Sequence, residues 1–147
     1  MAEARKSRPG LLALYELEFK LISDSKQDGR LENFYRGVIA DFSGKPLILL
    51  RFAERELSRP VGVQEPRYAL MLAQAAWGAP KFKEDREKGL VALEYSRILQ
   101  NCGRTDLALE MAKRAFVLLK GAPEHDTAKD CVNYYNRVLL LAPGIKL

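Results

Sequence analysis

The stretch GLVALEYSRILQNCGRTDLALEMAKRAFVLL, from Gly89 to Leu119, decides the fold. Its apolar residues recur at helical spacing on both sides of a break at residues 101–103, so it predicts two helices joined by a tight turn. Ser96, Ala108 and Ala115 are small residues at the positions where two such helices would touch. The stretch therefore predicts an antiparallel helical hairpin with close packing between its helices.

The same spacing predicts helices in the rest of the chain. They cover about 11–23, 30–42, 46–57, 67–77 and 124–141, and prolines or glycines stand at most of the breaks between them. The apolar run 47–50 could instead be a short buried strand, but no second strand is present to pair with it, so a helix is preferred. The prediction is an all-α protein of about seven helices with short connections.

Two of these helices have apolar residues whose spacing predicts a buried face. On the first helix this face holds Leu14, Leu17, Leu21 and Ile22. On the third helix the residues expected to be buried are Leu47, Leu50, Phe52 and Leu57. Both helices are therefore expected to contribute leucines to the core.

The hairpin at 89–122 resembles one unit of the tetratricopeptide repeat (TPR), a helix-turn-helix module of about 34 residues. Ser96, Ala108 and Ala115 match the small-residue positions of that family, and Gly103 matches its turn. The resemblance implies a right-handed stack of helical hairpins that binds proteins, closed by a capping helix at 124–141. Residues 66–142 are then TPR-like hairpins, 11–59 are N-terminal helices, and 1–10 are a flexible basic head of a single domain, 1–147.

The chain departs from the TPR pattern at four positions. Ala92, Leu99 and Ala112 stand where the family has large aromatic residues, and Lys120 stands where it has proline. Only one unit matches well, so a hairpin within an unrelated, irregular helical bundle is the alternative fold.

If the resemblance holds, the exposed face of the hairpin's first helix binds a peptide. That face carries Arg97, Gln100 and Asn101, with Leu90 and Leu93 at its apolar edge. Guanidinium and amide groups can hydrogen-bond a peptide backbone or a carboxylate. The alternative is that these side chains are simply exposed to solvent.

A second candidate site is a basic stripe on the third helix. Arg51, Arg55 and Arg59 recur every four residues, which would place three guanidinium groups on one face for phosphate or carboxylate. The chain carries 24 Lys and Arg against 19 Asp and Glu, a net charge of +5. This mild excess is compatible with a nucleic-acid partner but does not require one, because acidic residues are interspersed.

No catalytic, cofactor or metal motif is present in the sequence. The single histidine, His125, has no partners at metal-ligand spacing, and no phosphate-binding glycine loop occurs. The first apolar run, 11–22, contains three charged residues, so neither a membrane span nor a leader peptide is expected. The expectation is a non-enzymatic, cytoplasmic or nuclear protein that binds a protein or peptide partner, as an adaptor or scaffold subunit of a larger complex or as an oligomer. The alternative is a basic, helical nucleic-acid-binding subunit.

Overall fold

The computed structural model describes residues 11–22, 28–60, 62–79 and 81–146. Within these residues the chain forms seven helices and no strand, which confirms the all-α prediction and places the run 47–50 inside a helix. The predicted basic head, residues 1–10, lies outside the described residues. The helices are α2 (Leu11–Ile22), α3 (Asp28–Asp41), α4 (Pro46–Leu57), α5 (Pro66–Trp77), α6 (Asp85–Asn101), α7 (Thr105–Leu118) and α8 (His125–Lys146).

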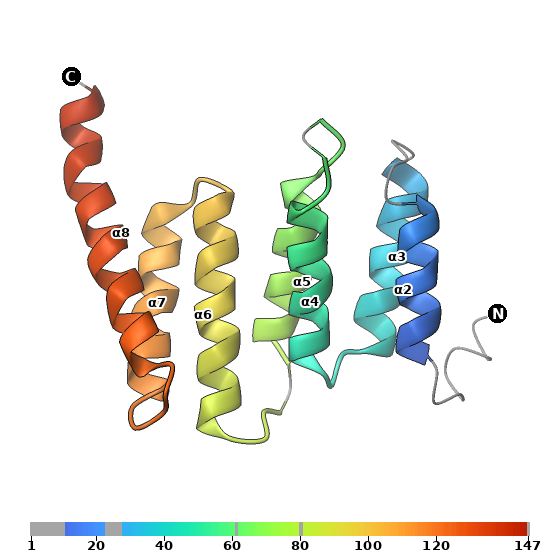
Figure 1. Cartoon of the computed structure of the whole chain (residues 1–147), viewed down its shortest axis with the longest axis horizontal. Helices are drawn as coiled ribbons and strands as arrows, with labels where there is room; N and C mark the ends of the chain where they lie inside the picture. Colours follow the sequence, from blue (N-terminus) through green and yellow to red (C-terminus); the bar gives the residue numbers. More distant parts are fainter. Residues whose placement is uncertain (1–10, 23–27, 61, 80, 147) are drawn as a thin grey trace.

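The helices stand side by side in a row of antiparallel pairs (Figure 1). α2 pairs with α3, α4 with α5, and α6 with α7, and α8 packs against α7 at the C-terminal end of the row. α6 also packs against both α4 and α5. The second and third hairpins are therefore stacked directly on each other, with α6 at the junction.

The turn between α6 and α7 shows why α6 ends at Asn101. Gly103 has a φ of 78°, a left-handed conformation that glycine adopts without a steric penalty. The N–H of Arg104 donates to the Leu99 carbonyl at 2.8 Å, and the N–H of Gly103 donates to the Gln100 carbonyl at 3.0 Å. This pair of bonds is a Schellman motif, which ends α6 and reverses the chain.

Small residues bring α6 and α7 close together, as the sequence predicts. Ser96, Ala108 and Ala115 are fully buried. A Cβ atom built on Gly89 would lie only 2.7 Å from Cγ of Leu119. The two helices therefore approach so closely that a larger side chain at position 89 would clash with α7's end.

Among the described residues, the core consists of two clusters that meet at α6. The first is rich in aromatic rings from α2 to α5, and Val91 and Ile98 of α6 belong to it. The second is aliphatic and joins α6, α7 and α8, with Ala128 and Tyr135 contributed by α8. Tyr95 on α6 contacts both clusters, so the core is continuous along the row.

The predicted buried face of α2 is wrong for three of its four residues. Leu14, Leu17 and Leu21 are 37%, 56% and 70% exposed, and Tyr15 and Phe19 are buried with Ile22 instead. The two aromatic side chains form their own helical stripe, and they bury more apolar area than leucine does. α2 is therefore rotated so that its rings pack edge-on against Phe34, Phe42 and Phe52.

Two further predictions on the helices need correction. On α4, Leu50 and Phe52 are buried as predicted, but Leu47 is 44% exposed and Leu49 takes its place in the core. α8 continues to Lys146 instead of ending at 141. Proline lacks the N–H that a helix uses, but its φ is compatible with helical geometry, so Pro143 does not stop α8.

Candidate functional site

Two adjoining pockets lie along α6 on one face of the row of helices. One lies between α6 and α8 and has a volume of about 400 Å³. The other lies between α4 and α6 and has a volume of about 350 Å³. Arg97 and Asn101 line both pockets. We call the combined depression the α6 groove; its walls come from α4 (Glu54, Leu57, Ser58), α6 (Glu94, Arg97, Ile98, Gln100, Asn101) and α8 (Thr127, Asp130, Cys131, Tyr134, Tyr135).

The predicted peptide-binding face falls partly within this groove. Arg97, Gln100 and Asn101 line it together, because residues three and four apart share one side of a helix. The two predicted apolar residues, Leu90 and Leu93, do not line the groove. Leu93 is buried in the same cluster as Ala128 and Tyr135 of α8, and Leu90 is half-buried against that cluster. The two leucines therefore belong to the core cluster that joins α6, α7 and α8 and do not line the groove.

The α8 wall supplies residues that sequence reasoning did not assign to the site. Tyr134 is 47% exposed at the groove and packs edge-on against the buried ring of Tyr135, with 5.7 Å between the ring centroids. Thr127, Asp130 and Tyr134 follow the helical spacing that places them on one side of α8. That spacing was visible in the sequence, but the position of α8 beside α6 was not.

The polar side chains of α6 are held in place by short contacts. Nη1 of Arg97 lies 2.8 Å from Oε1 of Glu94, one turn earlier on the helix. The Thr105 hydroxyl donates to Oε1 of Gln100 at 2.6 Å, which leaves the Gln100 amide group free to donate elsewhere. The guanidinium of Arg97 has further N–H groups beyond the one that meets Glu94. The groove therefore presents the N–H groups of Arg97 and Gln100 as hydrogen-bond donors that are held in fixed directions.

A pair of carboxyl groups gives the groove an acidic character. Burial and a hydrogen bond with the Glu54 side chain raise the pKa of Glu94 to about 7, despite the nearby Arg97. The lining also holds Asp130 on the α8 wall and one basic side chain, Arg97, so acidic groups outnumber basic ones even though Glu94 is about half protonated near pH 7. The whole chain carries +5, so this face differs in sign from the protein as a whole.

The structure brings together two of the three arginines of the predicted basic stripe and separates the third from them. Arg51 and Arg55 of α4 both pair with Glu16 of α2, at 3.6 and 3.2 Å. Arg59 is only 5% exposed and pairs with the buried Glu56 at 2.8 Å. α4 ends at Leu57, so Arg59 leaves the helical register that would have aligned it with the other two and turns into the core.

His125 stacks on Phe116 with ring centroids 4.3 Å apart. No three His, Cys, Asp or Glu residues gather as metal ligands within the described part of the chain. Among the described helices, none combines the length and the apolar character needed to cross a membrane.

Comparison of the chain with protein-family models, with curated proteins and with solved structures finds no match.

Proposed function

We propose that this protein is a non-enzymatic protein–protein interaction module, an adaptor or scaffold subunit of a larger complex, and that the α6 groove binds an extended segment of its partner. The observation that carries the proposal is the position of Arg97 and Asn101, which line both pockets. One segment lying across α6 can contact both residues and then enter the pocket on either side.

The groove's side chains suit a peptide. The amides of Gln100 and Asn101 can donate to and accept from a peptide backbone, and Arg97 can donate to a carbonyl or carboxylate. The exposed ring of Tyr134 offers an apolar surface with a polar end. The excess of acidic groups favours a segment that contains lysine or arginine. The resemblance of 89–122 to a TPR unit supports the same class of function, in the cytoplasm or the nucleus.

The nucleic-acid alternative has less support. Its predicted arginines are already engaged, because Arg51 and Arg55 pair with Glu16 and Arg59 pairs with Glu56. A phosphate would have to compete with the Glu16 and Glu56 carboxylates for these arginines.

The test is affinity capture from the native cell, with nuclease treatment, of the parent protein and of the double variant Arg97→Ala/Tyr134→Ala. Both side chains are well exposed, so the variant should fold as the parent does. Lys129→Ala, at an exposed position of α8 outside the groove, is the control. We expect at least one protein partner to be lost from the double variant and kept by the control. A partner list that is identical for all three proteins would contradict the proposal.

A further inference from the structure

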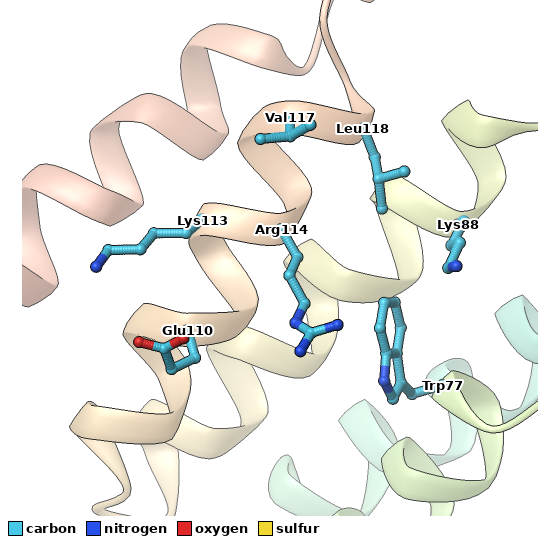
Figure 2. Close-up of a pocket in the computed structure, with 7 residues that line it drawn as sticks. All are labelled: Trp77, Lys88, Glu110, Lys113, Arg114, Val117 and Leu118. Atoms are coloured by element: carbon cyan, nitrogen blue, oxygen red, sulfur yellow. The ribbon is translucent and has the colours of Figure 1, made fainter.

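A third pocket opens on the other side of α6, between α5, α6 and α7 (Figure 2). Its volume is about 380 Å³, enough for one or two side chains of a partner. Trp77 at the end of α5 and Lys88 near the start of α6 line it. Lys88 and Arg97 are nine residues apart on α6, about two and a half turns, so they point in opposite directions. We call this depression the Trp77 pocket, and it is separate from the α6 groove.

Two cations are held at the indole ring. Nζ of Lys88 lies 5.5 Å from the ring of Trp77, and Cζ of Arg114 lies 5.8 Å from it. Figure 2 shows Arg114 reaching toward the ring from α7 and Lys88 standing on the ring's other side. Within the described residues neither cation takes part in an ion pair. The ring therefore orients two positive charges whose hydrogen-bond donors remain available to an anion.

The rim of the pocket combines this charge with exposed apolar surface. Val117 of α7 is 71% exposed, and Leu118 beside it is half-buried. Lys113 adds a third cation to the lining, although Figure 2 shows that its side chain projects outward from α7 and away from the indole. The pocket lining therefore combines positive charge with apolar surface from Val117 and Trp77, a mixture that protein–protein interfaces use.

We propose that the Trp77 pocket binds an acidic segment of a second protein partner, with an aliphatic or aromatic side chain against Val117 and Trp77 and carboxylates on Lys88 and Arg114. The charge of the pocket decides the charge of the partner: Lys88 and Arg114 lie at the ring, Lys113 lies at the rim, and Glu110 is the acidic residue in the lining. The apolar rim favours a peptide over nucleic acid, because an apolar side chain can pack against Val117 and a phosphate backbone cannot.

With this site the protein would have two surfaces that bind segments of opposite charge. The α6 groove favours a basic segment, and the Trp77 pocket favours an acidic one. The two lie on opposite sides of the same helix, so both partners can bind at once. The Trp77 pocket is argued from its own residues and does not depend on the proposed function of the groove.

The test uses three probes at physiological salt: a capped peptide of repeating Glu-Glu-Leu-Leu, a matched peptide of repeating Lys-Lys-Leu-Leu, and single-stranded oligo(dT) of the same charge as the acidic peptide. Trp77 is the only tryptophan in the chain, so its fluorescence reports on this pocket directly. Calorimetry supplies the dissociation constant. The variants are Lys88→Glu/Arg114→Glu, Val117→Ser, and the charge-matched control Lys45→Glu/Lys129→Glu, whose positions are exposed and outside the pocket.

We expect the acidic peptide to shift the Trp77 emission, the basic peptide to leave it unchanged, and the double reversal at Lys88 and Arg114 to weaken binding by about tenfold or more. Val117→Ser should weaken it several-fold, and the control should not. Variants of the α6 groove should keep this binding, which separates this proposal from the previous one. The proposal is overturned if the acidic peptide does not bind, if the double reversal leaves its affinity unchanged, or if oligo(dT) binds more tightly than the peptide does.

Discussion

Glu56 and Arg59 form an ion pair in which Nη1 lies 2.8 Å from Oε2 and both side chains are withdrawn from solvent. The same carboxylate accepts a hydrogen bond from the Tyr35 hydroxyl at 2.6 Å and one from the backbone N–H of Glu65 at 2.7 Å. It therefore ties together α3, the end of α4 and the residue before α5. Burial, and after it the hydrogen bond to Glu56, raise the pKa of Tyr35 far above its ordinary value.

The first prediction concerns the three arginines of the expected basic stripe. Arg59→Ala should lower the free energy of unfolding by about 3–5 kcal/mol, because it leaves the buried Glu56 carboxylate without its cation. Arg51→Ala should change it by less than about 1 kcal/mol, since the Arg51–Glu16 pair is largely exposed. Urea denaturation monitored by circular dichroism measures both. Equal effects at the two positions would mean that Arg59 is not a buried structural residue.

The second prediction concerns the close approach of α6 and α7. Alanine in place of a helical glycine normally stabilises a helix by about 0.5–1 kcal/mol. Gly89→Ala should do the opposite, by about 1–3 kcal/mol, because the new Cβ would lie 2.7 Å from Leu119 Cγ and 2.8 Å from its Cδ2. The change in melting temperature, measured by thermal unfolding, shows whether Gly89→Ala stabilises or destabilises the protein.

Gly44→Ala is the matched control for that experiment. A Cβ at position 44 meets no atom within 4 Å, and the backbone there is not left-handed. We expect it to be near neutral. A stabilising Gly89→Ala substitution would rule out the tight contact between the helices.

The third prediction concerns pH and the carboxyl pair in the α6 groove. Burial and the hydrogen bond with Glu54 raise the pKa of Glu94 from 4.5 to about 7, so the folded protein holds a proton there that the unfolded chain releases. The contribution of Glu94 to the free energy of unfolding is therefore fully present below about pH 4.5 and is lost as the pH rises through about 7.

Glu94→Gln should flatten that part of the stability profile between about pH 5 and 8, because glutamine does not titrate. Glu110→Gln, at an exposed position on α7, should leave the profile as it is. Urea midpoints measured across this range give both profiles. If Glu94→Gln and the parent protein lose stability in parallel as the pH rises, the carboxyl pair does not hold the proton.

The helices could be predicted from the sequence because local signals specify them. Pro46 and Pro66 stand in the first turns of α4 and α5, and Gly103 supplies the left-handed turn after α6. The orientation of α2 could not be predicted, because its leucines and its aromatic residues form two competing stripes. Which stripe is buried depends on the rings that α3 and α4 present to it.

The candidate site was predictable only where it lies on a single helix. Arg97, Gln100 and Asn101 share a side of α6 by spacing alone, and the structure brings them together in the groove. The walls depend on which helices lie beside α6, so Asp130 and Tyr134 of α8 were not identified. Sequence spacing also misplaced Arg59, because the four-residue repeat continues past the residue at which α4 ends.

The central claim, that the α6 groove holds a partner's segment, is tested most directly by photo-crosslinking in the native cell. A photoreactive phenylalanine analogue is placed at Asn101, which lines both pockets, and in a second protein at Lys129, which lies on α8 outside them. The account predicts that position 101 crosslinks to a discrete protein, that mass spectrometry maps the bond to one segment rich in lysine or arginine, and that Arg97→Ala/Tyr134→Ala suppresses it. If positions 101 and 129 yield the same products, or if the product at 101 survives the double substitution, the groove is not the binding site.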